Sequence, residues 1–218
     1  PAEPTVTIGS DSASIEELLG LNEGVLEGVY PTTVPTEETQ PETFSHTCAV
    51  RTAPVVKVAR PKALIPVFPG TNCEYDTARA LLHAGADAEI VVLRNLTAPD
   101  VARSVERFAK ALESAQMVVI PGGFSGGDEP DGSAKFITAF FRNPAVKEQV
   151  TALLERRDGL MLGICNGFQA LIKLGLVPYG KIIETDDKCP TLTYNTIGRH
   201  QSKLVRTRIC SNLSPWLA

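Results

Sequence analysis

The stretch Leu160-Met-Leu-Gly-Ile-Cys-Asn-Gly-Phe-Gln-Ala-Leu-Ile-Lys-Leu-Gly175 joins two different apolar patterns. Residues 160–162 form a short apolar run, which is typical of a strand buried on both faces of a parallel sheet. Residues 168–175 repeat apolar side chains at helical spacing and end at a glycine. The stretch therefore predicts a strand that turns sharply into a helix, as in an α/β protein.

Cys165 stands at the centre of that junction, within Gly-Ile-Cys-Asn-Gly. A Gly-x-Cys-x-Gly sequence between a strand and a helix is typical of a nucleophile elbow, with cysteine where serine usually stands. Gly163 and Gly167 suit such a turn, because larger side chains would collide there. The alternative is a structural cysteine buried at a strand end, and the paired glycines argue against it. We expect Cys165 to be an exposed nucleophile at a helix N-terminus, where the Asn166 amide can donate to an oxyanion.

The composition is that of an ordinary globular protein. The 218 residues are 43% hydrophobic and 21% charged, with a formal net charge of −4, which argues against a nucleic-acid binder. Five scattered cysteines form no Cys-x-x-Cys pair, and three histidines show no metal-binding spacing. No apolar run reaches membrane-spanning length, and no signal peptide is evident. We expect a cytoplasmic protein without a metal site or a membrane partner.

The first 62 residues differ from the rest of the chain. Residues 14–27 predict a short helix, with Ser14 as N-cap and Glu17 completing a capping box. Residues 31–61 are rich in Pro, Thr and Glu and predict an extended linker. Whether this part is a disordered tail or an ordered strap stays open at the level of sequence.

From Ala63 onward the pattern alternates between strands and helices. The expected strands cover residues 63–68, 89–93, 117–120 and 160–162, and the expected helices cover 72–84, 97–112, 143–158 and 166–175. Such alternation predicts an open, mostly parallel sheet with helices on both faces. Pro66 is unwelcome in a central strand, because it lacks a backbone donor. Leu82 is expected to face inward, and residues 203–210 alternate like a further, antiparallel strand.

Two further loops belong to the carboxyl edge of this sheet, where ligands of open α/β sheets bind. Residues 68–73 follow the first strand, and residues 121–128 follow the third. Gly122 and Gly123 can bring backbone amides close to a ligand and complete an oxyanion hole with Asn166. A plain glycine-rich turn is the alternative. The glycines do not match a phosphate-binding loop.

Three motifs together make a specific resemblance: Phe68-Pro-Gly-Thr-Asn-Cys73, Ile120-Pro-Gly-Gly-Phe-Ser125 and Leu162-Gly-Ile-Cys-Asn-Gly-Phe-Gln169. In this order and spacing they resemble the glutaminase domain of the formylglycinamide ribonucleotide amidotransferases (phosphoribosylformylglycinamidine synthases). The resemblance covers residues 62–218. It implies a flavodoxin-like fold of the triad, or class I, glutamine amidotransferases.

The resemblance also implies an activity, that of a carbon–nitrogen ligase with glutamine as amido donor. Cys165 would attack the glutamine carboxamide, forming a thioester and releasing ammonia. Gly123 and Asn166 would hold the oxyanion, and Gln169 would touch the substrate glutamine. The ammonia would pass to a synthetase domain that uses ATP and Mg²⁺ to amidate formylglycinamide ribonucleotide in purine biosynthesis. The glutaminase domain itself would need no cofactor.

Two segments favour a single long polypeptide over a separate small subunit. Residues 23–31 resemble the tail of a synthetase half, so residues 1–30 are expected to end such a domain. Residues 126–132 replace the Tyr-Gly-Asp form that is common in the separate subunit. We therefore expect the synthetase partner on the same full-length polypeptide.

The chain departs from the family in lacking the His-x-Glu pair that activates the cysteine. His200 has no acid two residues later and falls in the wrong part of the pattern. We expect a glutaminase domain that is incomplete after Ala218 and inactive alone. The alternatives are another flavodoxin-like cysteine hydrolase, with its base inside this chain, or a non-catalytic docking module.

Overall fold

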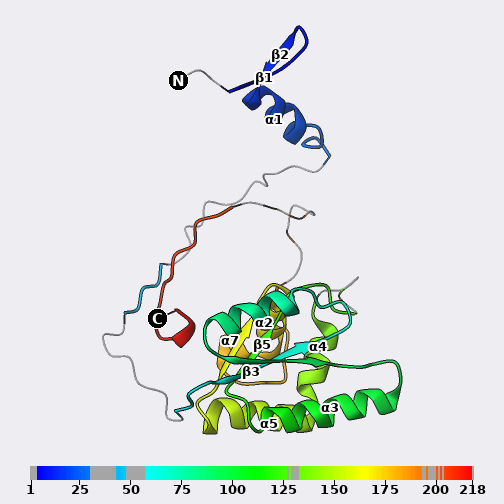
Figure 1. Cartoon of the computed structure of the whole chain (residues 1–218), viewed down its shortest axis with the longest axis vertical. Coiled ribbons are helices and arrows are strands. Elements are labelled where there is room, and N and C mark those ends of the chain that lie inside the picture. Colours follow the sequence, from blue (N-terminus) through cyan, green and yellow to red (C-terminus); the bar gives the residue numbers. More distant parts are fainter. Residues whose placement is uncertain are drawn as a thin grey trace. The chain divides into compact units, whose positions relative to one another are not determined.

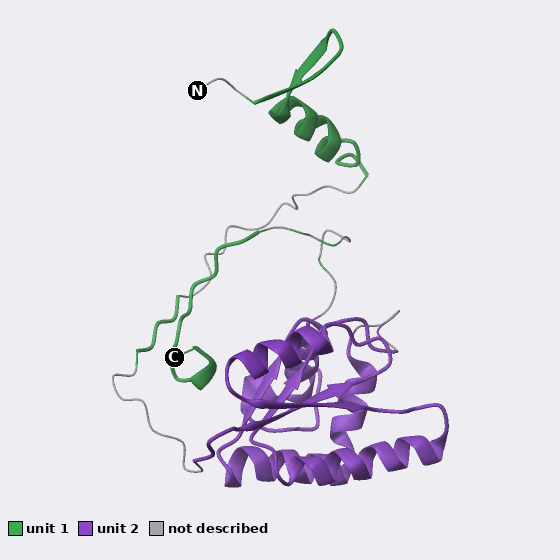
Figure 2. Cartoon of the chain, in the orientation of Figure 1, with its two compact units in different colours: residues 1–51, 194–218 green, residues 52–193 purple. Residues whose placement is uncertain are grey.

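The computed structural model describes residues 4–29, 43–47, 57–126, 128, 133–192, 195, 200, 202 and 204–217. The chain divides into two compact units, one of Pro1–Arg51 with Tyr194–Ala218 and one of Thr52–Thr193 (Figure 2). Most of the predicted linker, residues 31–61, lies outside the described residues. In the described part of the chain, no helix is long and apolar enough to cross a membrane.

The first unit begins with a hairpin that the sequence did not lead us to expect. Strands β1 (Thr5–Ile8) and β2 (Asp11–Ser14) pair antiparallel, and helix α1 (Ile15–Gly24) follows directly. The predicted cap is confirmed, since the Ser14 hydroxyl accepts the Glu17 amide at 3.0 Å. The helix ends at Gly24, earlier than expected.

The strand predicted at residues 203–210 was wrong for the described residues 204–210, which belong to no strand. Leu204 and Val205 are almost fully exposed there. Alternating apolar residues form a strand only where a partner strand pairs with them. An isolated bridge lies just after this described segment and joins His46 to Ser211. A short 3₁₀ helix, η2 (Pro215–Leu217), follows.

The second unit is built on a four-stranded parallel sheet. Its strands are β3 (Lys62–Val67), β4 (Asp87–Val92), β5 (Met117–Ile120) and β6 (Leu160–Gly163), in the spatial order β4-β3-β5-β6 (Figure 1). This order is that of a flavodoxin-like sheet and confirms the predicted fold class. The chain adds β4 on one side of β3 and then β5 on the other side. The loops that follow β3 and β5 therefore flank the point where the direction of strand addition changes, the topological switch point.

Pro66 lies in the central strand β3 without breaking a ladder. Successive residues of a strand direct their backbone groups alternately toward the strand on one side and the strand on the other. In β3, the Val67 carbonyl accepts the Leu93 amide from the β4 side, and the Lys62 carbonyl accepts the Gln116 amide from the β5 side. Pro66 is four residues after Lys62, so its backbone nitrogen is also directed toward β5. The β3–β5 register ends at Leu64, two residues earlier, so the missing donor has no ladder partner to lose.

The described residues of this unit form six α-helices: α2 (Glu74–His83), α3 (Ala98–Leu112), α4 (Lys135–Arg142), α5 (Pro144–Thr151), α6 (Asn166–Leu174) and α7 (Leu176–Tyr179). A π-helical turn, η1 (Ala152–Arg156), extends α5. Thr97 and Asn143 cap α3 and α5 by accepting the amides of Asp100 and Ala145. Helix α4 was not predicted, although Ile137, Phe140 and Phe141 are buried at helical spacing.

The helices cover both faces of the sheet, as predicted. Helix α2 packs on β3 and β4, on the opposite side from α3 and α5 (Figure 1). The larger core joins one face of the sheet to α3, α4, α5 and α6 and contains Leu64, Val118 and Ile120. The prediction for Leu82 was wrong, because this side chain is 49% exposed. Thr77 is the buried residue of α2, and Leu82 points away from that face.

Phe108 is one of the residues through which α3 enters the larger core, together with Val105 and Leu112. Its side chain is fully buried, and its ring meets those of Phe140 and Phe141 edge-to-face at centroid distances of 5.5 and 5.8 Å.

We expect Phe108→Ala to lower the free energy of unfolding by about 3–5 kcal/mol, because it leaves a cavity in a close-packed core. Urea unfolding followed by circular dichroism measures the change. Tyr75→Ala is the control, since Tyr75 is 75% exposed on α2. Equal losses in both variants would contradict the burial assigned to Phe108.

Candidate active site at the carboxyl edge of the sheet

Cys165 occupies the turn between β6 and α6 in a strained backbone conformation. Its φ and ψ angles are 52° and −108°, outside the backbone regions that residues other than glycine prefer. The turn is held by hydrogen bonds from the Ile164 amide to the Ile120 carbonyl (3.0 Å) and from the Gly167 amide to the Ile164 carbonyl (2.9 Å). The Cys165 thiol is free and exposed. These features are those expected of a nucleophile elbow.

The two flanking glycines are required by close backbone approach. A Cβ on Gly163 would lie 2.5 Å from the carbonyl of Gly167, on the next turn of chain. A Cβ on Gly167 would overlap the carbonyl of Ile120 in β5. Both positions therefore admit only glycine without a shift of α6. The sequence argument for the elbow is confirmed in this respect.

The glycine loop after β5 lies directly against Cys165. A Cβ on Gly122 would be 3.2 Å from the Cys165 Cβ and 3.9 Å from its Sγ. The two residues are 43 positions apart in the sequence, and the β5–β6 register brings them together by pairing Ile120 with Gly163. A side chain at position 122 would therefore crowd Cys165, and glycine avoids this contact.

The loop after β3 holds the glycine loop in place. The Asn72 amide donates to the Gly122 carbonyl, and the Phe124 amide donates to the Gly70 carbonyl, each at 2.9 Å. Gly123, between them, has a φ of +119° and forms an isolated bridge with Thr71. These bonds use the Gly122 carbonyl and the Phe124 amide, and not the Gly123 amide.

All five residues predicted for the site lie at this edge of the sheet. Gly122 contacts Cys165, and Gly123 follows it. Asn166 begins α6, where N–H groups have no acceptor within the helix. Gln169 lies one turn further along α6, and its Oε1 accepts the Asn166 Nδ2 at 3.3 Å. The roles of these residues in binding an oxyanion and glutamine stay predictions.

The side chain of Asn166 belongs to a network that the sequence did not reveal. Asn166 is 2% exposed, and its Nδ2 donates to Asp128 Oδ2 at 3.0 Å. Asp128 Oδ1 accepts the Ser125 hydroxyl at 3.1 Å and the Ala134 amide at 2.6 Å. Only the backbone amide of Asn166 can therefore serve a ligand. The one sequence signal for this network was an aspartate at the end of the glycine loop.

A lysine of α6 lies within electrostatic range of the same carboxylate. Burial lowers the pKa of Lys173, the charge of Asp128 opposes that shift, and the charge of Lys135 adds to it. The carboxylate of Asp128 thus acts on α6 through hydrogen bonds and through its charge.

Comparison with known proteins identifies the family. Residues 60–218 match the model of the CobB/CobQ-like glutamine amidotransferase domain. The chain belongs to this family.

Several relatives of this amidotransferase domain are named phosphoribosylformylglycinamidine synthase subunit PurQ. That of Treponema denticola is 36% identical over 152 residues, covering 66% of this chain and 52% of the relative. That of Dehalococcoides mccartyi is 35% identical over 146 residues, covering 67% and 51%. The chain thus spans about half the length of the curated relatives it matches. A solved structure of PurLQS from Thermotoga maritima is 28% identical, with a TM-score of 0.38, covering 54% of this chain and 45% of that one.

In the described residues of the second unit, no histidine lies beside Cys165. His83 is the last residue of α2, which runs from the carboxyl edge of the sheet back to the amino edge. His46 and His200 belong to the first unit. Cys73 begins α2 in a left-handed conformation (φ 68°), and its carbonyl accepts both the amide and the hydroxyl of Thr77. These bonds involve the Cys73 backbone and not its thiol.

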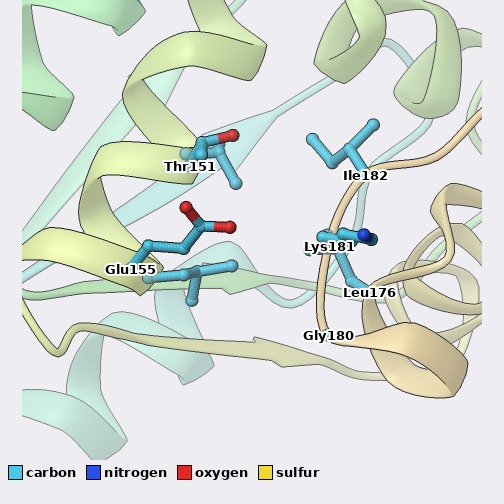
Figure 3. Close-up of a pocket in the computed structure, with 8 residues that line it drawn as sticks. Thr151, Glu155, Leu176, Gly180, Lys181 and Ile182 are labelled. Atoms are coloured by element: carbon cyan, nitrogen blue, oxygen red, sulfur yellow. The ribbon is translucent and has the colours of Figure 1, made fainter.

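A small hollow of the amidotransferase domain lies away from this site. It is lined by the end of α5 and by residues after α6, with Thr151 and Glu155 facing Leu176, Lys181 and Ile182 (Figure 3). Its volume is about 10 Å³, which holds about one water molecule. It contains none of the predicted site residues. Among the described residues, no group of His, Cys, Asp and Glu side chains could hold a metal ion.

We expect Gly167→Ala to lower the free energy of unfolding by about 1–3 kcal/mol, because the new methyl group pushes α6 away from β5. It should also change the rate at which iodoacetamide labels Cys165, measured by peptide mass spectrometry. Gly126→Ala is the matched control in the neighbouring loop, because its Cβ would have no atom nearer than 4.0 Å. Identical behaviour of the two variants would contradict the close packing of α6 on β5.

Proposed function

We propose that this chain is the glutaminase part of a phosphoribosylformylglycinamidine synthase. One observation supports this most strongly: Gly122 and Cys165 come from loops far apart in the sequence, yet a Cβ on Gly122 would lie only 3.2 Å from the Cys165 Cβ. Glycine at position 122 therefore keeps a side chain away from the sulfur, which a carboxamide has to approach. Membership of the glutamine amidotransferase family and the names of the relatives support the same conclusion.

In the proposed reaction, the Cys165 sulfur attacks the side-chain carbonyl carbon of glutamine. The carbonyl oxygen becomes an oxyanion, which accepts hydrogen bonds from the Gly123 and Asn166 amides. A base takes the thiol proton and returns it to the leaving nitrogen, so that ammonia departs and a γ-glutamyl thioester remains. Water then hydrolyses the thioester to glutamate. Gln169 contacts the bound glutamine.

The ammonia serves a synthetase domain, which we place on the same full-length polypeptide. The synthetase binds ATP and Mg²⁺ and uses the ammonia to convert formylglycinamide ribonucleotide to its amidine. The apolar residues around the mouth of the site suit a protein partner: Phe124, Ile164 and Phe168 are 81%, 47% and 40% exposed. We place the reaction in the cytoplasm, as the scattered, odd-numbered cysteines led us to expect from the sequence.

We expect Cys165→Ala in the full-length enzyme to abolish synthesis from glutamine and to spare synthesis from added ammonia. The reason is that only the first reaction needs the thioester, whereas the synthetase site is intact. Amidine formation is measured with each nitrogen source. Loss of both activities would contradict a separate glutaminase site that supplies ammonia.

We expect the 218-residue chain to hydrolyse glutamine at least a hundredfold more slowly than the full-length enzyme, because general-base catalysis is worth about 10²–10⁴ in rate. The base we propose is a His-x-Glu pair outside these 218 residues. Glutamate release is measured for both proteins, with Cys165→Ala as the blank. Turnover by the short chain that Cys165→Ala removes would place the base inside it. That result would favour a self-contained cysteine hydrolase, and a full-length protein that never releases glutamate would favour a docking module.

A further inference from the structure

We propose that Asp128 is a positioning residue that fixes the two oxyanion donors relative to one another. The inference rests on the proposed glutaminase reaction, in which the Gly123 and Asn166 amides act together. These amides come from separate elements, the glycine loop after β5 and the first turn of α6. A hole made of two such donors needs a connection that keeps the loop and the helix in register.

The Asp128 carboxylate supplies that connection. Its Oδ2 accepts the Asn166 Nδ2 at 3.0 Å, which ties it to the residue whose amide begins α6. Its Oδ1 accepts the Ser125 hydroxyl at 3.1 Å, two residues after Gly123. A longer contact of 3.4 Å, from the Ser125 amide to Asn166 Oδ1, closes the ring. Ser125 and Asn166 are each 2% exposed, so water competes little for these bonds.

The same carboxylate anchors the segment that leads into α4. Its Oδ1 accepts the Ala134 amide at 2.6 Å, and Ala134 is fully buried with a φ of 61°. Asp128 therefore accepts from three donors that belong to the loop, to α6 and to the start of α4. It reaches no reacting atom itself, since its bonds go to groups behind the donors.

The network can be broken and restored without a change of side-chain size. In Asp128→Asn, an amide nitrogen replaces one oxygen and must face a donor, either Asn166 Nδ2 or the Ala134 amide. Rotating the Asn166 amide only moves the conflict to the Ser125 amide. In the double variant Asp128→Asn with Asn166→Asp, the donors and acceptors exchange places. Every donor of the network then faces an acceptor, once the Gln169 side-chain amide rotates so that its nitrogen donates to the new carboxylate at position 166.

The first test measures glutamine hydrolysis by the full-length enzyme. We expect Asp128→Asn to lower kcat about a hundredfold with KM changed less than threefold, because misplaced oxyanion donors weaken only transition-state binding. Asn166→Asp alone should also be impaired, because two carboxylates would then face each other. The double variant should recover at least tenfold over Asp128→Asn. Ammonia-dependent synthesis should stay unchanged in all three.

The proposal is overturned if Asp128→Asn keeps kcat within twofold, if its defect lies in KM alone, or if the double variant recovers nothing. A structural role alone would not produce a kcat defect that reverses when the two side chains are exchanged.

The second test separates this proposal from the proposed function. Amide hydrogen exchange in the 218-residue chain should accelerate at least tenfold at Ser125 and Ala134 in Asp128→Asn and return toward the original rate in the double variant. The Leu93 amide, which donates to Val67 in the sheet, is the control and should not change. If the wild-type enzyme did not hydrolyse glutamine, the proposed function would be refuted. The hydrogen-exchange rates would still show whether Asp128 connects the glycine loop to α6. Unchanged exchange at Ser125 and Ala134 would overturn it.

Discussion

The active edge depends on one close contact, that of the Gly167 backbone with Ile120 at the end of β5. No side chain separates helix α6 from the strand there. The contact draws the start of α6 beside the loop that leaves β5, which puts Cys165 against Gly122. The strained angles of Cys165 follow from the same contact, because the chain has to reverse within two residues to reach it.

The sheet order provides the place for this contact. Because the order reverses between β3 and β5, the loops after these strands leave side by side and bond to each other. Pro66 fits this arrangement. Its missing donor faces the region where β3 and β5 no longer pair, so loop-to-loop hydrogen bonds replace ladder bonds beyond Leu64. The glycine loop is thus supported by its neighbour and not by the sheet.

Local signals predicted the four strands of the parallel sheet, the elbow and most helices, because each has a period, a cap or a glycine with a steric cause. Among the features that were not predicted correctly, three have a clear physical reason. Helix α4 is short and rich in aromatic residues, which favour strands when considered alone. Residues 204–210 alternate without a partner strand. The Asp128 network joins residues up to 41 positions apart, and hydrogen bonds at such separations depend on tertiary structure, which no local pattern reports.

The space at Gly122 has an evolutionary consequence. The hydrogen that stands there in place of a side chain cannot be exchanged without filling the room before the sulfur, and Gly163 and Gly167 are equally closed to substitution. Phe124 and Ile164 in these loops and Phe168 in the first turn of α6 are exposed and face no such limit. Selection therefore restricts the glycines that hold the Cys165 turn and leaves these exposed neighbouring positions free to vary.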